Sequence, residues 1–564
     1  MNKQALGKRG IAYFTMEIGL DPEMPTYSGG LGVLAGDTIK SCADLGVPII
    51  AVTLLNEKGY FRQKFDAEGS QSEFPVDWPK EEFVKLLPVQ VSVNIEGREV
   101  RIKIWKYIVQ GITGATVPVY FLDTNLQENS EYDRTLTSFL YGGDQWYRLC
   151  QEIILGIGGV RAIEAIGYQN IEKYHMNEGH ASLLALELLE RTKKDSEEDI
   201  YKKYDLDSVR NKCIFTTHTP VAAGHDRFPL DLVKRALRSN LSFEMPDIFI
   251  RDNEINMTWI ALNLSKYING VAKKHGEVTR EMFPGYSIDS ITNGIHLLTW
   301  AAPAFKKLYD KYIPGWQSDY FSLRYALSIP KEEIFQAHFE AKKELIDYVN
   351  ARTGIGLEHD TFTIGFARRV TAYKRANLLL TDINRLVEIN DKTGKMQIVY
   401  AGKAHPKDGG GKELIKKIFS KIKELNPEIK IAYLENYDMT QGRLITGGVD
   451  LWLNNPLPPR EASGTSGMKA CLNGVPNLSV LDGWWIEGCI ENVTGWAIGS
   501  VQKQNADSAQ DAHDLYQKLE KVIIPTFYKE KDKWLEIMRH TIALNASFFN
   551  TQRLVQEYVL KAYL

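Results

Sequence analysis

Short runs of apolar residues alternate along the chain with longer segments in which apolar residues recur at helical spacing. This alternation predicts an α/β fold, in which parallel sheets are covered by helices on both faces. Several expected strands run directly into polar or glycine-rich segments: residues 213–217, 361–367, 397–401 and 429–435. Because ligands bind beyond the carboxyl ends of strands in open α/β sheets, these segments indicate where a site is expected.

One part of the chain has a different pattern. Residues 89–95 and 99–105 both alternate apolar and polar positions, and Gly97 lies between them. This is typical of an antiparallel hairpin with one wet face, added to the first sheet. A domain boundary is predicted after residues 291–296, because a long helical stretch follows and a new series of strands begins at Thr361. Each half is large enough to hold its own core.

Composition excludes several classes of protein. The chain has 564 residues, of which 44% are hydrophobic and 25% charged, so it is neither disordered nor fibrous. A net charge of −3 gives no global positive field for nucleic acid. The apolar run 47–55 is too short to span a membrane, and Glu17 interrupts any signal-type apolar core. The five scattered cysteines form no CxxC pair and are interpreted as buried thiols of a cytoplasmic protein.

The first candidate motif is the glycine-rich segment YSGGLGVLAGD, residues 27–37, which precedes a helical segment. Glycines such as Gly29 and Gly30 let the backbone approach a ligand, and a helix start offers free N–H groups to an anion. A tight turn between strand and helix would explain the same glycines. The motif by itself therefore leaves both interpretations open.

The second candidate motif combines Arg368, Arg369 and Lys374 at the end of a predicted strand, entering an expected helix. Guanidinium groups bind phosphate bidentately, and an ammonium group adds a point charge. Cations oppose the helix dipole at an N-terminus, so their position there favours a phosphate site over a solvated helix start.

The third candidate motif is EASGTSGMK, residues 461–469. Lys469 is expected where the helical segment KACLNG begins. A lysine among small and apolar neighbours can have a lowered pKa and form an imine with an aldehyde. A surface loop lysine is the alternative that composition does not exclude.

Histidine-containing segments were weighed for metal binding. The segment YHMNEGH, residues 174–180, matches neither HExxH nor HxxEH, so no metal site is predicted. His218 lies at a strand end before Pro220, a position that favours a ligand pocket. Residues 412–425 place lysines opposite apolar positions, which indicates a solvated outer helix rather than a nucleic-acid or membrane surface.

At the third motif the sequence resembles the α-glucan phosphorylase family, which includes glycogen, starch and maltodextrin phosphorylases. EASGTSGMK is similar to that family's cofactor-lysine signature, EASGTGNMK. Further similar segments follow the same chain order: GGLGVLAGD, RLCQE, YHMNEGH, THTP, ITNG, ARRVTAYKR, AGKAHP and LENY. The resemblance covers most of the chain and points to a short prokaryotic-type form.

The resemblance implies a fold of two Rossmann-like domains facing across a cleft, of the GT-B glycosyltransferase type. The domains would be residues 1–296 and 297–546, with residues 547–564 forming a helix that crosses back to the first domain. Pyridoxal 5′-phosphate would be held as a Schiff base on Lys469. The reaction implied is reversible phosphorolysis of a terminal α-1,4-linked glucose to glucose 1-phosphate, with retention of configuration.

The resemblance also implies roles for single residues. Those that would bind the substrate phosphate are Arg368, Arg369, Lys374, Gly29 and Gly30. Those near the cofactor phosphate would be Thr465, Ser466 and Tyr437. Glucose contacts would come from His218, Asn293, Tyr373, Glu461, Ser463 and Gly464. The cofactor acts in this family through its phosphate, as an acid–base partner of inorganic phosphate.

Several positions depart from the family pattern. Arg368 stands where the well-known members have Lys, the cofactor loop reads Ser-Gly where they have Gly-Asn, and Asp438 replaces a basic residue. One glucose-contacting loop is not recognisable, although Asp144 is a possible substitute. The short chain leads us to expect little regulation by phosphorylation or nucleotides.

The expected partners are α-1,4-glucan, inorganic phosphate and glucose 1-phosphate, with neither nucleic acid nor membrane, and a homo-oligomer is possible. Three rival interpretations remain for testing. A nucleotide-sugar glycosyltransferase such as glycogen synthase shares the Arg-x4-Lys clamp but has no cofactor lysine. A non-catalytic glucan-binding protein would not need both the clamp and Lys469. An aminotransferase would leave the sugar-site residues unexplained.

Overall fold

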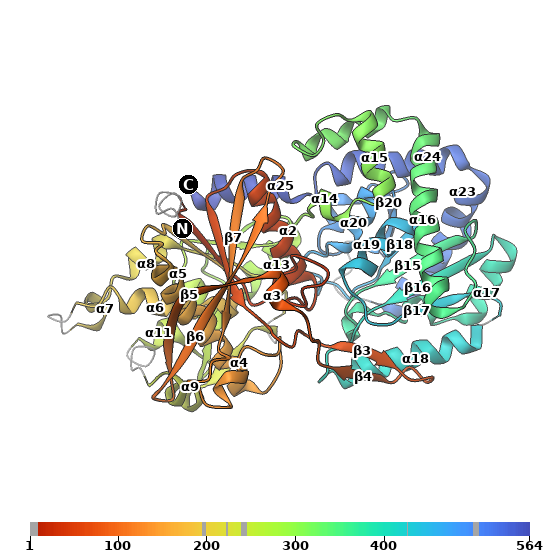
Figure 1. Ribbon diagram of the computed structural model, residues 1–564. Helices are drawn as coiled ribbons and strands as arrows, with labels where there is room; N and C mark the ends of the chain where they lie inside the picture. Colours follow the sequence, from red (N-terminus) through yellow and green to blue (C-terminus); the bar gives the residue numbers. More distant parts are fainter. Residues whose placement is uncertain (1–8, 195–198, 222–223, 239–244, 426, 500–506) are drawn as a thin grey trace.

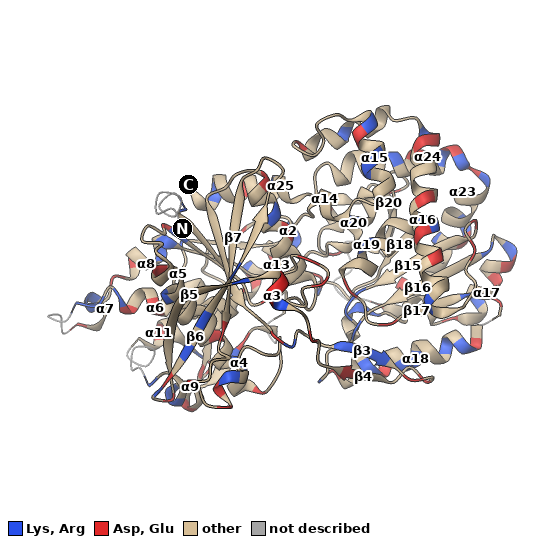
Figure 2. Cartoon of the chain, in the orientation of Figure 1, with Lys and Arg blue, Asp and Glu red and all other residues tan. Residues whose placement is uncertain are grey.

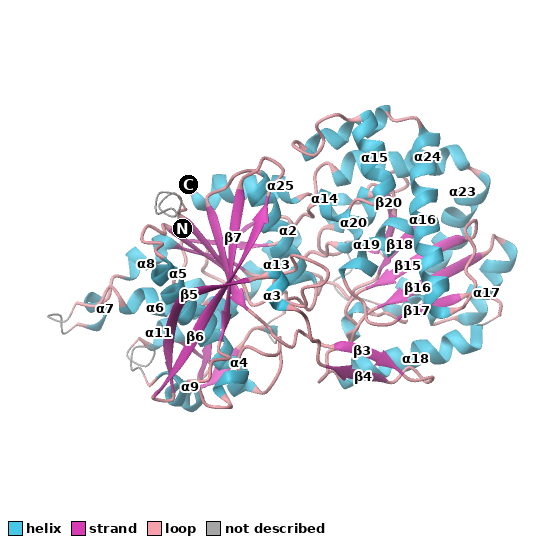
Figure 3. Cartoon of the chain, viewed as in Figure 1, coloured by secondary structure: helices cyan, strands magenta, loops and turns pink. Residues whose placement is uncertain are grey.

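The computed structural model describes residues 9–194, 199–221, 224–238, 245–425, 427–499 and 507–564. Its chain forms two halves, each built on a largely parallel sheet with helices packed on both faces (Figures 1 and 3). The predicted α/β class is therefore confirmed.

The first half holds a nine-stranded sheet. Its strands in spatial order are β14 (Asp289–Ser290), β13 (Tyr267–Gly270), β9 (Cys213–Thr216), β8 (Lys173–Asn177), β1 (Ile11–Phe14), β2 (Ile49–Leu54), β7 (Thr116–Asp123), β6 (Arg98–Gln110) and β5 (Lys85–Ile95). Strands β14 to β7 are parallel, whereas β5, β6 and β7 pair antiparallel, with Val93 opposite Val100. The predicted hairpin is thus confirmed as the edge of the first sheet.

The second half holds a six-stranded sheet. Its order is β17 (Ile431–Leu434), β16 (Met396–Ala401), β15 (Phe362–Ala367), β18 (Leu451–Asn454), β19 (Asn477–Val480) and β20 (Gly495–Ile498). Every pairing in this sheet is parallel, and these strands are almost entirely buried, as expected where helices cover both faces. Strands β9, β15, β16 and β17 coincide with the four predicted segments.

The covering helices follow the predicted alternation with the strands. In the first half they are α2 (Gly30–Asp44), α3 (Lys80–Phe83), α4 (Gln145–Ile153), α5 (Gly159–Ile166), α6 (Leu183–Glu190), α7 (Ile200–Lys203), α8 (Leu206–Lys212), α9 (Leu230–Leu237), α11 (Pro246–Phe249), α12 (Met257–Asn263) and α13 (Lys273–Met282). In the second half they are α14 (Leu297–Trp300), α15 (Pro303–Tyr312), α16 (Lys331–Thr353), α17 (Ile383–Lys392), α18 (Gly409–Leu425), α19 (Met439–Gly448), α20 (Ser466–Leu472), α21 (Trp485–Gly488), α22 (Ser508–Lys518), α23 (Ile524–Lys529) and α24 (Lys531–His540). Two small sheets complete the fold: β3 (Arg62–Phe65) with β4 (Gln71–Phe74), and β10 (Arg227–Pro229) with β12 (Glu254–Asn256) and β11 (Ile250–Arg251).

Charged residues lie on helices, strands and loops of both halves. Figure 2 shows lysine and arginine interspersed with aspartate and glutamate on both halves in this view. On α18 the apolar Ile415 and Ile418 are buried, while its lysines lie on the other side, as predicted for an outer helix. Among the described helices, none combines the length and the apolar character that crossing a bilayer requires.

The two halves are tied together by the β3–β4 hairpin, which leaves the first half and lies against the second beside α18 (Figure 1). The side-chain amide of Gln71 donates to the Ala404 carbonyl at 2.8 Å and accepts from the Ala404 amide at 3.0 Å. Gln63 exchanges bonds of 3.1 and 3.0 Å with Asn436 and donates to the carbonyl of Gly402 at 3.0 Å. The hairpin thereby fixes the segments that follow β16 and β17.

The end of the chain returns to the first half. Helix α25 (Thr551–Tyr558) packs on α2, and the Tyr563 hydroxyl meets Nδ1 of His175 at 2.7 Å. The hydroxyl of Tyr558 lies 3.0 Å from that of Thr216, at the end of β9. Tyr558 and Tyr563 are therefore buried against β8 and the end of β9.

Helix α2 begins earlier than the sequence suggested, because Gly30 is its first residue and the glycine-rich segment forms its first two turns. The helix crosses the chain closely at Gly19. A Cβ on Gly36 would lie 1.8 Å from the Gly19 carbonyl oxygen, whereas a Cβ on Gly30 would meet nothing within 4 Å. Close packing thus explains why residue 36 is a glycine, but it does not explain the glycine at position 30.

We expect Gly36→Ala to lower the free energy of unfolding by about 1–3 kcal/mol or more, because an added methyl group must force the α2 crossing apart. Gly30→Ala, in the same helix, is the matched control and should leave stability equal or slightly higher. Urea unfolding of the two variants measures the difference. Equal loss in both variants would contradict the packing explanation.

Candidate active site

All fifteen residues singled out by the sequence line one cavity of about 630 Å³ between the two halves. They are Gly29, Gly30, His218, Asn293, Arg368, Arg369, Tyr373, Lys374, Tyr437, Glu461, Ser463, Gly464, Thr465, Ser466 and Lys469. His218 follows β9, Arg368 follows β15 and Tyr437 follows β17, so carboxyl ends of strands from both sheets face this space.

A buried cluster of charges lies on the side of the second half. Oε2 of Glu461 accepts bonds from Arg368 Nη2 at 2.5 Å and from Lys374 Nζ at 2.6 Å. Burial by itself raises the pKa of Glu461, but the charges of the two cations outweigh it and hold the pKa at about 2. Arg368 also donates to Asn454, while its buried Nε has no hydrogen-bond partner in the part of the chain that the structure describes. Arg368 and Lys374 are thus held in place around one carboxylate.

The sequence predicted that these cations enter a helix, but the structure shows no α-helix in this segment. After β15 the chain forms a short 3-10 turn, Ala372–Lys374, and α17 begins only at Ile383. Arg375 has a φ of 47°, in the left-handed region, which ends the turn. Tertiary contacts of Lys374 with Glu461 replace the helix that local sequence favoured.

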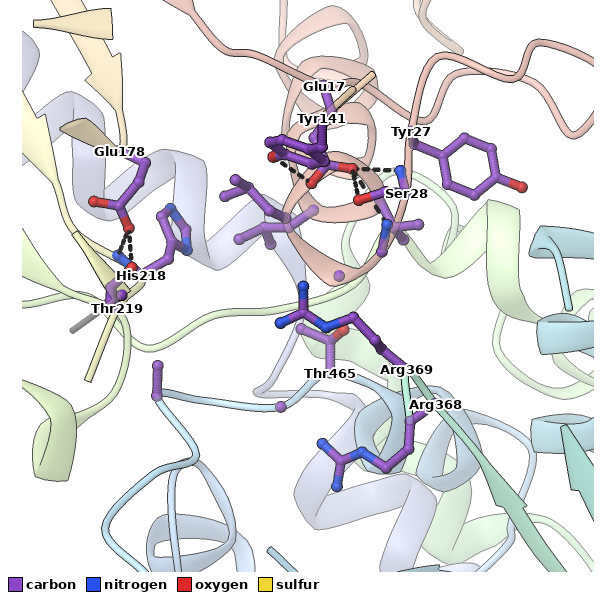
Figure 4. Close-up of a pocket in the computed structure, with 18 of the residues that line it drawn as sticks. Glu17, Tyr27, Ser28, Tyr141, Glu178, His218, Thr219, Arg368, Arg369 and Thr465 are labelled. Atoms are coloured by element: carbon purple, nitrogen blue, oxygen red, sulfur yellow. Dashed lines mark hydrogen bonds between the residues drawn. The ribbon is translucent and has the colours of Figure 1, made fainter. Parts of the chain in front are cut away.

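Arg369 is the cation that faces the open space. Its side chain extends into the region that Ser28 and Thr465 also border (Figure 4). Among the described residues, no carboxylate forms an ion pair with it, unlike Arg368 and Lys374. A second cavity lysine, Lys403, donates to the Phe61 carbonyl at 2.8 Å, and burial lowers its pKa to about 8.

The glycine-rich start of α2 is held by Glu17, a residue that sequence reasoning did not select. Oε2 of Glu17 accepts from the amides of Ser28 at 2.5 Å and Gly29 at 3.2 Å, and Oε1 accepts from Tyr141 at 3.0 Å (Figure 4). Burial raises the pKa of Glu17, and these bonds oppose the rise. The amide of Gly29 is therefore engaged within the protein, which leaves Gly30 as the start of the helix.

Lys469 lies inside a helix rather than at its beginning. Gly464, with a φ of 76°, turns the chain, and α20 starts at Ser466. The lysine is 8% exposed, and its Nζ lies 3.4 Å from the centre of the Trp300 ring. Burial lowers the pKa of Lys469 to about 8. A larger fraction of its amino group is neutral near neutral pH than in an exposed lysine.

The first half contributes a neutral histidine. Nε2 of His218 lies 2.7 Å from Oδ1 of Asn177, and the His218 amide donates to Glu178 at 2.7 Å. Burial lowers the pKa of His218 well below its ordinary value. The bond to Asn177 assigns the proton to Nε2 and leaves Nδ1 as an acceptor. Asn293 Oδ1 and Ser463 Oγ, also in the cavity wall, are buried and have no hydrogen-bond partner among the described residues.

The other weighed positions have their own partners. His175 contacts Tyr563 and Thr216, and His180 Nε2 accepts from the Met16 amide at 3.2 Å. Within the described ranges, no group of three or more His, Cys, Asp or Glu side chains is arranged to hold a metal. Asp144 lines the cavity but caps α4 by accepting from the Tyr147 amide at 2.9 Å.

Further residues of the cavity wall escaped sequence reasoning. They include Glu17, Tyr60, Tyr141, Arg148, Asp226, Trp300, Lys407 and Arg460. Lys403, by contrast, directly follows the strand predicted at 397–401, where the strand-end rule already predicted a site. Trp300 and Tyr141 carried no local signal, because only the packing of the two halves brings them to the site.

Two parallel sheets whose strand ends meet at a cation-lined cavity define an α/β enzyme suited to anionic substrates. A family model for carbohydrate phosphorylases matches residues 244–498. The chain is 41% identical to a maltodextrin phosphorylase of Thermococcus litoralis, over 98% of this chain and 70% of that protein. It is 39% identical to a glycogen phosphorylase of Mycobacterium tuberculosis, with shares of 98% and 70%, and 34% identical to one of Aquifex aeolicus, with shares of 99% and 86%.

The chain belongs to the carbohydrate phosphorylase family. The family resemblance read from the sequence motifs is thereby confirmed.

We expect Glu461→Gln to lower the free energy of unfolding by about 3–5 kcal/mol, because Arg368 and Lys374 would be buried without a counter-charge. Added phosphate or sulfate should restore part of this loss by binding the freed cations. The measurement is thermal unfolding with and without phosphate. Glu424→Gln, which breaks an exposed pair with Lys421, is the control and should change little. Unchanged stability of Glu461→Gln would refute the charge balance described here.

Proposed function

We propose that this protein is an α-1,4-glucan phosphorylase, which converts a terminal glucose of glycogen or maltodextrin and inorganic phosphate reversibly into glucose 1-phosphate with retention. The observation that carries the proposal is that Lys469, from one segment, and Arg369 with Lys374, from another, line one cavity together with His218 and Asn293 of the first half. The names of the relatives, maltodextrin and glycogen phosphorylase, support the same substrate class.

The residues around Lys469 fit pyridoxal 5′-phosphate. An aldehyde needs a neutral amine, and burial lowers the pKa of Lys469 to about 8. Trp300 offers a flat apolar face to an aromatic ring, and Thr465 and Ser466 line the same space with hydroxyl groups. When bound, the group supplies a phosphate that exchanges a proton with the substrate phosphate, not the electron sink it provides elsewhere.

The cations solve an electrostatic problem of this chemistry. Two unit charges about 4 Å apart repel each other by about 4 kcal/mol at an effective dielectric constant of about 20, and two phosphates carry more than one charge each. Arg369 has no internal carboxylate partner among the described residues and is the cation that a substrate phosphate meets first. Arg368 and Lys374 share the single negative charge of Glu461, so this cluster keeps one net positive charge for the phosphates.

The proposed sugar side combines neutral groups with the carboxylate of Glu461. His218 presents an acceptor at Nδ1, and Asn293 Oδ1 and Ser463 Oγ are the buried atoms that glucose hydroxyls would satisfy. Tyr373, Glu461 and Gly464 complete the proposed glucose contacts. With phosphate held on the side of Arg369, attack and departure take place on one face of the sugar, which gives retention.

We also propose the GT-B arrangement, with domains 1–296 and 297–546 and a returning helix within 547–564. The separate sheets and the packing of α25 on α2 support this division. All five cysteines are free thiols, which supports a reducing, cytoplasmic setting.

The test is an assay of phosphate-dependent glucose 1-phosphate release from maltodextrins, with and without added pyridoxal phosphate. Release that requires both phosphate and cofactor supports the proposal. Turnover of a nucleotide sugar without a cofactor absorption band would favour a glycosyltransferase of the synthase type. Maltodextrin binding without any release would favour a non-catalytic glucan-binding protein.

We expect Arg369→Ala and Lys374→Ala each to reduce phosphorolysis by about 2–4 kcal/mol in transition-state terms and to raise the phosphate requirement, because each removes a charge from the phosphate site. Initial rates over a range of phosphate concentrations measure both effects. Lys412→Ala, which removes a lysine paired with Glu73 outside the cavity, should retain wild-type kinetics. Near wild-type phosphorolysis in either clamp variant would refute its assigned role.

Cofactor capture by the apo protein should depend on pH through Lys469. Because burial lowers its pKa to about 8, the rate should rise as pH increases toward 8 and level off above it, well below the ordinary lysine range. Stopped-flow absorbance at several pH values measures this rate, and Lys469→Ala should show no covalent capture. A rate that still climbs steeply above pH 9 would contradict the lowered pKa.

A further inference from the structure

A buried carboxylate, Asp37, lies beside Lys469 and has no part in the mechanism above. On α2 it follows Val33 and Leu34 by one helical turn, so it lies on the face of the helix that those cavity residues define. Asp37 is only 1% exposed. An acidic residue in such a position calls for a positive or hydrogen-bonding partner.

Only one oxygen of Asp37 has such a partner. Oδ2 accepts from the indole Nε1 of Trp300 at 2.7 Å. Oδ1 is buried and lacks any hydrogen-bond partner among the described residues. Leaving a buried carboxylate oxygen unsatisfied is costly, which indicates a partner that the protein chain itself does not supply.

Trp300 links this carboxylate to Lys469. Asp37 binds the edge of the indole, while Nζ of Lys469 lies 3.4 Å from its ring centre, over the face. One rigid ring therefore holds the carboxylate and the amino group near each other. Burial lowers the pKa of Lys469, and the charge of Asp37 raises it.

Other titratable groups surround the pair. They are Lys40, Asp21, Asp44, Tyr320 and His296. Lys40 donates to Thr299 at 3.2 Å and opposes a positive charge on Lys469. Asp44 is already engaged by His296 at 2.9 Å. Asp37 is therefore the carboxylate that acts directly on Lys469.

We propose that Asp37 is the buried counter-charge of the cofactor at Lys469, with its free oxygen Oδ1 accepting from a protonated nitrogen of the bound pyridoxal group. The inference rests on the proposed function, because it requires this cofactor. A carboxylate facing a pyridoxal nitrogen is a general way in which proteins set the protonation of this cofactor. Asp37 is a positioning residue here, since the phosphate chemistry takes place elsewhere on the group.

The test is a pH titration of the absorbance of bound cofactor in Asp37→Asn and in the wild type. Asparagine keeps an oxygen for the Trp300 bond, removes the charge and places an NH2 donor where the acceptor Oδ1 lies in the wild type. We expect the titration midpoint to fall by about one pKa unit or more, and the dissociation constant of the cofactor to rise by at least about tenfold. Asp44→Asn, on the same helix and also buried, is the matched control and should keep the wild-type midpoint.

Two further arms sharpen the result. Asp37→Glu retains the charge and should restore the wild-type midpoint, which also covers the case that Asp37→Asn folds poorly. A pyridoxal phosphate analogue without the ring nitrogen distinguishes the two nitrogens: the effect of Asp37→Asn disappears if the ring nitrogen is the partner and persists if the Lys469 nitrogen is.

A midpoint unchanged in Asp37→Asn, or lowered equally in Asp37→Glu, would overturn the inference while the proposed function stands. Failure of wild-type protein to form any absorbing adduct, checked by borohydride trapping on Lys469, would instead overturn the proposed function. The two failures are thus distinguishable.

Discussion

The structure depends on keeping several cations close together in the cavity between the two halves. Arg368 and Lys374 converge on one carboxylate, Glu461, whose pKa their charges hold near 2 against the effect of burial. Arg369 stays without such a partner among the described residues and faces the open space. A protein that neutralised all three cations internally would have no field for an anion, and one that neutralised none would destabilise its own core. The arrangement between these extremes is what a phosphate-handling site requires.

The close approach of α2 to the preceding chain sets the shape of the opposite wall. Gly36 allows the helix to cross the Gly19 carbonyl, and Glu17 holds the amides of Ser28 and Gly29. The free space beside Gly29 and Gly30 is therefore not a gap in packing but the rim of the cavity. The same helix carries Asp37 toward Trp300 and so connects the glycine-rich wall with the surroundings of Lys469.

Contacts between the halves hold the two sides of the cavity in place relative to each other. The β3–β4 hairpin bonds the segments that hold Lys403 and lead to Tyr437, and the final helix fastens the ends of β8 and β9 beneath His218. Both ties use hydrogen bonds with paired donors and acceptors, which fix direction as well as distance. These bonds hold positions that are far apart in sequence in a defined arrangement around the cavity.

The sequence alone determined the α/β class, the edge hairpin and the strands that end at the site, because periodicity and strand-end chemistry are local properties. The proposed clamp was selected from its residues, whereas the proposed roles of the cofactor loop rest on the resemblance to a family. The sequence also predicted a helix after Arg369 and a helix start at Lys469, and both were wrong. Lys374 turns inward to Glu461, and Gly464 lets α20 begin at Ser466, so tertiary contacts and backbone freedom outweighed local propensity. Only the tertiary structure assigned Glu17 to the glycine-rich amides and set Trp300 between Asp37 and Lys469. These pairings join segments separated by hundreds of residues or by a helix crossing, and no local pattern encodes which distant side chain will satisfy a buried charge.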